Sequence, residues 1–489
     1  MTRSLKDVLR ENDPLHVDDS PVGVFEGQSL RGKTRIFITS AQNATPVHEE
    51  FWRVIQHICA EENAALVVIP TRYKNPTSRW VGSQEGKGLW VPEVQPYLTS
   101  VRRQLNTNLM LLADIKIQPT AADPLTGFES VSGALSGIVG HPKIQTRSIA
   151  TPQSKMAKLL LTTGSCTKQN YSDTRAGRVG EFHHSLSGLI VEIEGPYFWV
   201  RRMHYDTRTK SVTDAARGRR YFATRSETAP RALALACGDL HERFADPAVV
   251  KATWGPGGMI EVARPQHVIY HDITDSYAVN HHHGKNPFFR IGKRRSGMDD
   301  LRAEVEHTIE FLREHPTPGG QSVVVPSNHP DFFARWMAEN DWRNDPVNAE
   351  FYLESALMMV RGCRTDRAKG TSWPDPFAHW LRAAKLPNTR VLNDDESFTL
   401  ANVELGMHGH QGPNGRRGSI RNIRRIGVKS IIGHSHSPGE DEGCTQVGTS
   451  TRLRLEYNHG PSSWLQAHCF LNADGKRQLC FIINGRFKL

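Results

Sequence analysis

Hydrophobic residues in the first half of the chain gather in short runs on either side of an amphipathic stretch. Residues 34–42 (TRIFITSAQ) and 65–70 (ALVVIP) are strand-like, and residues 47–64 between them place apolar side chains at helical spacing. This order predicts a βαβ unit and therefore an α/β fold near the N-terminus. Residues 187–206 contain two apolar runs around a Gly-Pro pair, which predicts a β-hairpin.

Beyond residue 231 the pattern changes, because each apolar run leads directly into a polar cluster. Five runs share this feature: residues 232–242, 266–275, 322–332, 402–412 and 428–437. Apolar residues at helical spacing occur between some of them, in residues 299–315, 331–340 and 348–362. Strands that alternate with helices and end in polar residues are typical of α/β domains with a functional site at the strand ends.

The domain organisation follows from these two patterns. A length of 489 residues suits two or three domains. Residues 1–30 are polar and contain prolines and glycines, so we expect a flexible leader. A polar, arginine-rich stretch at residues 206–231 is the expected domain boundary. We therefore predict an N-terminal α/β domain over residues 31–228 and a second domain over residues 229–489 that ends in a β extension.

A nucleotide-binding motif near the N-terminus is rejected. Residues 27–34 (GQSLRGKT) have the spacing of a phosphate-binding loop. Such a loop must lead into a helix whose N-terminus meets the phosphates. The residues that follow, 35–40 (RIFITS), are strand-like, so we interpret the motif as a polar loop that enters the first strand.

Composition narrows the class of partner. The chain has 61 Lys and Arg against 51 Asp and Glu, a formal net charge of +10. This excess favours a polyanionic partner such as nucleic acid, with a solvated basic surface as an equal alternative. Seven scattered cysteines without a C-x-x-C pair fit a reducing compartment. No apolar run approaches the ~18 residues that span a membrane, so we expect no membrane contact.

The polar clusters offer oxygen and nitrogen donors that suit a metal. In chain order they contain Asp239 and His241, Asp272, Asn328 and His329, His408 and His410, and His434 and His436. Hard oxygens combined with imidazoles favour manganese, iron or zinc over calcium. One such residue alone would more often be a hydrogen-bonded core residue, but five clusters that each follow an apolar run are hard to explain by chance.

The series D-x-H, D, N-H, H-G-H, G-H-x-H over about residues 230–440 resembles the calcineurin-like metallophosphoesterase superfamily. The resemblance implies a two-layered β-sandwich flanked by helices, with a two-metal site at strand ends. The family usually has glycine where this chain has His271 and Ser327, and both positions are backbone-packing positions rather than ligands. The implied metal ligands are Asp239, His241 and His436 for one cation, Asn328, His408 and His434 for the other, and Asp272 as the bridge.

The chemistry of these residue types agrees with the implied roles. Two cations about 3.5–4 Å apart clamp a phosphate and lower the pKa of a bridging water, so that hydroxide exists at neutral pH. Asp272 suits the bridge because a carboxylate has two oxygens, and Asn328 adds an oxygen without charge. The resemblance implies that His329 protonates the leaving oxygen, which an imidazolium can do near pH 7.

Basic residues between the metal motifs favour DNA as the substrate. The expected substrate contacts are His410, Arg416, Arg417 and Arg421, and Arg424, Arg425 and Lys429 follow in the same segment. A second cluster contains Arg290, Lys293, Arg294 and Arg295. Clusters of this kind can follow a phosphate backbone, although solvated helix and loop faces are the alternative.

Residues 161–193 and 460–487 are similar to phage-encoded metallophosphoesterases, a group that includes host-DNA-degrading proteins of large tailed phages. This similarity implies a manganese-dependent DNase in the cytoplasm of an infected bacterium, acting as a homo-oligomer, with Mg²⁺, Fe²⁺ and Zn²⁺ as alternative cations. Two other functions stay open: a phosphomonoesterase or small cyclic-nucleotide phosphodiesterase, and a non-catalytic DNA-binding or host-interaction protein with a structural metal. The sequence does not rank the roles of the N-terminal half.

Overall fold

The computed structural model describes most of the chain, in two compact units. The described residues are 24–25, 28–29, 34–72, 90–152, 156–284, 286–366, 370–456 and 458–488. Most of the expected leader and most of the loop at residues 27–34 lie outside them. The first unit comprises residues 1–214, 219–228 and 488–489, and the second comprises residues 215–218 and 229–487. The chain passes between the units three times within the arginine-rich stretch at residues 206–231, and once more at residues 487–488.

The first unit contains the predicted βαβ unit. β3 (Arg35–Gln42) and β4 (Ala65–Thr71) are parallel and flank α2 (Glu49–Glu61). The His48 side chain caps α2, and the helix buries its apolar side against the sheet. The strand that follows residue 34 confirms that residues 27–34 do not lead into a helix. The predicted hairpin at residues 187–206 is also confirmed, as antiparallel β10 (Ser187–Glu194) and β11 (Tyr197–Asp206).

The other elements of the first unit complete two groups of strands. The seven-stranded sheet has the order β14-β13-β12-β11-β10-β3-β4. Its remaining strands are β12 (Ser211–Asp214), β13 (Arg219–Tyr221) and β14 (Ser226–Thr228). The second group pairs in the order β8 (Gln145–Ile149), β9 (Lys158–Thr162), β7 (Ser136–Val139), β6 (Leu109–Leu112) and β5 (Arg102–Asn106). α3 (Phe128–Val131), α4 (Arg175–His183) and the pair β1 (Val24–Phe25) and β2 (Gln28–Ser29) are also in this unit.

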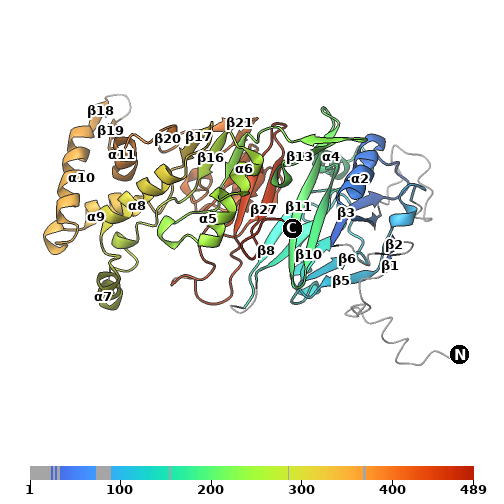
Figure 1. Cartoon of the computed structure of the whole chain (residues 1–489), viewed down its shortest axis with the longest axis horizontal. Helices are drawn as coiled ribbons and strands as arrows, with labels where there is room; N and C mark the ends of the chain where they lie inside the picture. The colour runs from blue at the N-terminus through green and yellow to red at the C-terminus, as the bar shows by residue number, and fades with distance from the viewer. Residues whose placement is uncertain are drawn as a thin grey trace. The chain divides into compact units, whose positions relative to one another are not determined.

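The second unit has a six-stranded sheet in the order β20-β17-β16-β15-β26-β27. β15 (Ala234–Ala236), β16 (His267–Tyr270), β17 (Gln321–Val324) and β20 (Thr389–Val391) are parallel, so their carboxyl ends share one edge. β26 (Ala467–Leu471) and β27 (Arg477–Phe481) are antiparallel. One apolar core joins this sheet to helices on its flank (Figure 1): α5 (Pro247–Trp254), α6 (Met259–Ala263), α8 (Leu301–Glu314), α9 (Asp331–Glu339), α10 (Ala349–Gly362) and α11 (Pro376–Ala383).

Further strands of the second unit pair in the order β21-β22-β23-β25-β24. Their bounds are β21 (Thr399–Leu400), β22 (Val403–Glu404), β23 (Lys429–Ile432), β24 (Gly439–Asp441) and β25 (Cys444–Gln446). β22, β23 and β25 are parallel, which again places carboxyl ends at one edge. α7 (Pro287–Ser296), α12 (Ile420–Ile423) and the pair β18 (Arg364–Asp366) and β19 (Gly370–Ser372) complete the unit. The structure is therefore mixed α/β, and none of its described helices is long and apolar enough to cross a membrane.

Candidate metal centre

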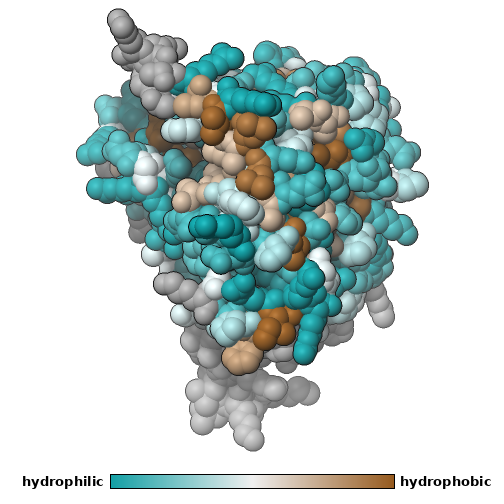
Figure 2. Space-filling view, turned by 90° about the vertical axis from the view of Figure 1, so that its left-hand side faces the viewer, coloured by the Kyte–Doolittle hydropathy of each residue, from teal (hydrophilic) through white to brown (hydrophobic). Residues whose placement is uncertain are grey.

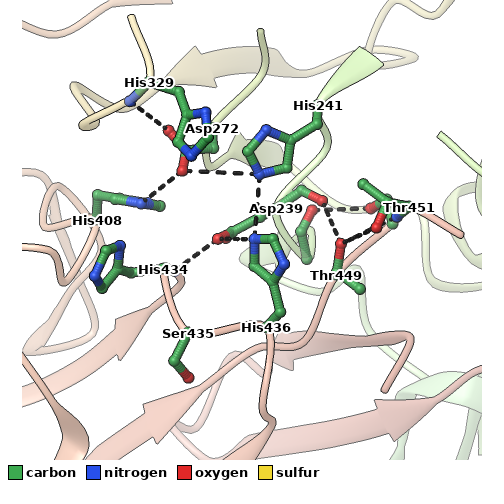
Figure 3. A network of polar contacts seen from close by, with 12 residues as sticks. Asp239, His241, Asp272, His329, His408, His434, Ser435, His436, Thr449 and Thr451 are labelled. Carbon is green, nitrogen blue, oxygen red and sulfur yellow. Dashed lines mark hydrogen bonds and ion pairs between the residues drawn. The ribbon is translucent and has the colours of Figure 1, made fainter. Parts of the chain in front are cut away.

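The polar clusters at the five strand ends lie together in the second unit. β15, β16 and β17 each end two to four residues before Asp239, Asp272 and Asn328. β22 and β23 end at the same spacing before His408 and His434. Parallel pairing places the first three loops at one edge of their sheet and the last two at one edge of a second sheet, and the loops of the two sheets converge, as Figure 3 shows. The structure thus brings together all seven predicted ligands from segments up to about 200 residues apart in the sequence.

One group of donors contains Asp239, His241 and His436. Asp239 Oδ2 lies 3.1 Å from His436 Nε2, and His436 Nε2 lies 3.1 Å from His241 Nε2. All three side chains are buried. The donor atoms lie within 4.8 Å of one another. Ligands about 2.0–2.2 Å from a metal can be at most ~4.4 Å apart, so the two separations of 3.1 Å suit a single cation.

A second group contains Asp239, Asp272 and His408, again with donor atoms within 4.8 Å of one another. His408 Nε2 lies 3.0 Å from Asp272 Oδ2, and the same oxygen lies 3.9 Å from His241 Nε2 of the first group. Asp272 therefore stands between the two groups, where a bridging carboxylate is expected. Asp239 belongs to both groups, which its sequence position did not indicate.

The last two predicted ligands contact each other beside these groups. His434 Nδ1 lies 3.0 Å from Asn328 Oδ1, and the backbone N–H of His434 donates to Asp239 Oδ2 at 2.8 Å. His434 follows Gly433, where a Cβ atom would lie only 2.2 Å from Asp239 Oδ1. Glycine thus permits the close approach of the fifth loop to the first carboxylate.

Backbone strain is concentrated at the same residues. Asp272, His241, His434 and His436 have φ angles of 39°, 40°, 79° and 58°, in the left-handed region that non-glycine residues rarely occupy. Each such conformation costs on the order of 1–3 kcal/mol and persists where the surrounding structure enforces it, commonly at functional sites. Four strained residues among seven candidate ligands indicate that this part of the fold is shaped for a purpose other than stability.

Electrostatics leaves Asp272 and His434 in forms that bind cations. Burial raises the pKa of Asp272, but His408 and His329 more than offset this and hold that pKa well below its usual value. Burial and the nearby His408 lower the pKa of His434 to about 4. At pH 7 the carboxylate is therefore ionised and the imidazole is neutral, as metal ligation requires. Asp239 Oδ1 is buried and has no hydrogen-bond partner among the described residues, so a cation would satisfy an atom that is otherwise costly to bury.

His329 lies beside the two groups and has a partner that sequence reasoning missed. Its Nδ1 is 2.9 Å from Asp275 Oδ1, and the same oxygen is 2.9 Å from His241 Nδ1. Burial lowers the pKa of His329, but the carboxylates of Asp272 and Asp275 raise it to about 10. The imidazole is therefore protonated at neutral pH. Asp275 lies three residues after Asp272 in the same loop, and this spacing alone does not say where its carboxylate points.

The predicted substrate contacts fall into two kinds. The His410 ring lies 5.5 Å from that of His408 and 6.2 Å from that of His434, so it borders the donors directly. Arg416, Arg417 and Arg421 are exposed and form no ion pair among the described residues. They extend from the loop that carries His408 and His410, and their cationic groups remain available to an anion.

Other residues of the predicted basic and histidine clusters have structural partners. Arg424 forms an ion pair with Asp441 at 2.6 Å, so it is not a free phosphate contact. His271 is buried with its ring 5.6 Å from that of His408, and burial lowers its pKa to about 4. It occupies one of the two positions at which the resemblance predicts glycine. Ser327 is buried as well.

Comparison with known proteins gives one informative match. The chain is 29% identical over 488 residues to Protein A1 of Escherichia phage T5, which covers 95% of this chain and 84% of the phage protein. The similarity indicates a phage-encoded protein. No protein-family model matches the chain, and no solved structure matches it.

Proposed function

We propose that this protein is a metal-dependent phosphodiesterase of the calcineurin-like type and that DNA is its substrate. The proposal rests on one observation above all, the convergence of seven donor side chains from five strand ends on one small volume. These donors are Asp239, His241, Asp272, Asn328, His408, His434 and His436. The two-sheet arrangement of the second unit is compatible with the β-sandwich that the superfamily resemblance implies.

The donor set fits a pair of divalent cations, and we propose Mn²⁺, with Mg²⁺, Fe²⁺ or Zn²⁺ as alternatives. Carboxylate, amide and imidazole ligands together suit these ions. Asp239, His241 and His436 would hold one cation, and Asn328, His408 and His434 the other, with Asp272 between them. When bound, the cations would offset the negative charge of a phosphodiester and supply an activated water.

The protein's own contribution to bond cleavage would come from His329. The carboxylates of Asp272 and Asp275 raise its pKa, and Asp275, which is not one of the seven proposed metal ligands, would favour the protonated ring with the cations bound. A protonated imidazole next to the metal groups can donate a proton to the leaving oxygen. Asp275 fixes the ring through the 2.9 Å contact to Nδ1, which leaves Nε2 to face the substrate. The buried Asp275 stays ionised, because His329 and His241 lower its pKa despite burial.

DNA is proposed because cations without partners border the same site. Arg416, Arg417 and Arg421 are exposed in the segment between the two histidine loops. A backbone of regularly spaced phosphates can contact several such residues at once, whereas a single nucleotide cannot. Cleavage should therefore weaken steeply as salt increases. The similarity to a phage protein suits a DNA-directed activity but does not specify one.

The test is hydrolysis by purified protein with Mn²⁺, Mg²⁺ or Zn²⁺ on linear DNA, circular DNA and bis-p-nitrophenyl phosphate. We expect cleavage of both DNA forms and the small diester with Mn²⁺, and none by Asp272→Ala. Cleavage of small nucleotides alone would favour the phosphomonoesterase or cyclic-nucleotide alternative. Stabilisation by metal without hydrolysis of any phosphoester would favour a structural metal in a binding protein.

We also propose that the protein forms a homo-oligomer through α10. Figure 2 shows apolar side chains on the face of the molecule at the α10 end of the second unit. Leu353, Leu357 and Val360 are 46%, 49% and 70% exposed and share one side of the helix. Exposed Glu350 and Arg361 flank this stripe at opposite ends. An antiparallel pair of α10 helices would join the stripes and place each glutamate beside the partner's arginine.

A further inference from the structure

α7 is a basic helix with an exposed apolar side. It stands apart from the other helices of the second unit (Figure 1). Phe288 is 78% exposed and Ile291 is 48% exposed, and both share a side of the helix with the exposed Arg295. Arg290 and Arg294 are exposed next to this side. The helix therefore presents an aromatic ring and an aliphatic side chain among three guanidinium groups.

The opposite side of α7 fixes the helix to the rest of the unit. Lys293 Nζ is buried and donates to the backbone carbonyls of Tyr277 and Ala278, at 3.3 Å for Ala278. The Phe289 ring stacks on His283 with centroids 4.6 Å apart. Lys293 is thus an anchor of the helix, which corrects its expected role as a phosphate contact.

α7 contacts the same loop that contributes residues to the candidate metal centre. Asp275 contacts His241 and His329. Two residues later, the backbone carbonyl of Tyr277 accepts the hydrogen bond from Lys293. The Tyr277 hydroxyl donates to Glu456 at 2.6 Å, which holds this end of the loop. A ligand on the outer side of α7 would therefore contact an element that is joined through one short, hydrogen-bonded loop to the catalytic groups.

The arginines of α7 are available to an anionic partner. Among the described residues, Arg290 and Arg295 form no ion pair, and Arg294 has only an exposed contact of 3.4 Å with Asp299. An exposed ion pair of this kind contributes about 0–1 kcal/mol to stability, so a phosphate can readily displace Asp299 from Arg294. These guanidinium groups can bind phosphates, and the exposed Phe288 ring can stack on a planar base. A nucleic acid offers both groups.

We propose that α7 is a strand-binding helix that positions single-stranded or locally opened DNA for the metal centre. Phe288 stacks on a base, Ile291 extends this apolar contact, and Arg290, Arg294 and Arg295 hold the flanking phosphates. This inference rests on the proposed phosphodiesterase function and names the substrate form that the site receives. A membrane surface is the less suitable partner, because a ten-residue helix with two exposed apolar side chains offers little area to insert.

The experiment compares three variants with the wild type. Phe288→Ala removes the ring, Phe288→Trp retains a stacking surface, and the triple variant Arg290→Ala, Arg294→Ala, Arg295→Ala removes three charges. The matched control is Arg313→Ala, Arg335→Ala, Arg343→Ala, because these arginines are on the same unit and are already paired with carboxylates. The readouts are KM for single-stranded and duplex DNA, its salt dependence, and hydrolysis of bis-p-nitrophenyl phosphate.

The expected results separate α7 from the metal centre. Phe288→Ala should raise KM for single-stranded DNA about tenfold, because one base–aromatic stack is lost, and Phe288→Trp should restore it. The α7 triple variant should make KM for single-stranded DNA less dependent on salt. The slope of log KM against log salt should fall by about 2, at roughly 0.7 per lost phosphate contact. Hydrolysis of the small diester should not change in any variant.

Different results would overturn the inference and the proposed function. Unchanged KM and salt slope in both α7 variants would refute it while the proposed function stood, and so would equal losses in the control triple variant. If the wild type hydrolyses neither DNA nor the small diester, the proposed function fails, and anisotropy of a fluorescent single-stranded oligonucleotide still tests α7. Binding to anionic vesicles with no binding to the oligonucleotide would replace DNA by a membrane surface.

Discussion

Replacing Asp275 by asparagine tests the acid role of His329 without removing any of the seven predicted metal ligands. Asp275 Oδ1 lies 2.9 Å from Nδ1 of both His329 and His241. The substitution keeps the size of the side chain and removes one of the two carboxylates that raise the pKa of His329 to about 10. A hydrogen bond to a charged partner contributes about 1.5–3 kcal/mol, which corresponds to about one to two pH units in the pKa of His329.

The direction of the effect follows from the proton that His329 must hold. The protonated form is active, so activity is lost as pH rises through the pKa of His329. Asp275→Asn lowers that pKa, and the alkaline limb of the kcat profile should move to lower pH by about one to two units. Since a p-nitrophenolate leaves without a proton, the variant should lose more activity on DNA than on bis-p-nitrophenyl phosphate.

The assay is a pH profile of kcat on both substrates at saturating Mn²⁺. Saturation is needed because Asp275 also orients His241, and loss of such a partner weakens metal affinity about 10–100-fold. The matched control is Asp300→Asn, since Asp300 caps α8 through Ala303 N–H and asparagine caps a helix equally well. An unchanged alkaline limb, or equal losses on both substrates with metal bound, would refute the assignment of His329 as the acid.

Three further outcomes follow from the structure. Gly433→Ala should weaken Mn²⁺ binding at least tenfold, because the new Cβ would displace Asp239. Gly443→Ala has room for the added Cβ and should leave Mn²⁺ binding unchanged. Calorimetry measures the affinity of both variants. Burial lowers the pKa of His408, but Asp272 and Asp239 more than offset this and raise it, so protons compete with the metal. Mn²⁺ affinity should therefore fall about tenfold for each pH unit below that pKa, and a constant affinity from pH 8 to pH 6 would contradict this. Leu357→Glu should dissociate the proposed oligomer by placing a charge in the apolar stripe, and light scattering that shows the wild-type mass would count against α10.

The loops that carry the candidate ligands could be predicted from the sequence, because the hydrophobic pattern shows where each strand ends. Each apolar run stops two to four residues before a donor. Parallel pairing then places the first three loops at one edge of one sheet and the last two at one edge of another. Asp275 was missed for the opposite reason. Nothing in a single D-x-x-D spacing says that the second carboxylate turns toward His329 rather than toward solvent, because only the fold fixes that direction.

Charge was the least predictable property of the sequence. Lys293 and Arg424 occur in runs of basic residues that looked equivalent, yet one is buried as an anchor and the other is paired with Asp441. Their neighbours Arg295 and Arg421 stay exposed. Whether a cation is free depends on tertiary contacts with distant carboxylates and carbonyls, which sequence proximity does not reveal. The βαβ start of the first unit was predictable, because local hydrophobic periodicity specifies it.

The most direct test of the two-cation centre is Mn²⁺ binding followed by electron paramagnetic resonance. Calorimetry should give two Mn²⁺ ions per chain, and the spectrum should show two coupled spins, because a pair bridged by one carboxylate is about 3.5–4 Å apart. Asp272→Ala should lose the coupling. Wild-type protein that takes up one ion, or two ions whose spins are independent, would contradict the account.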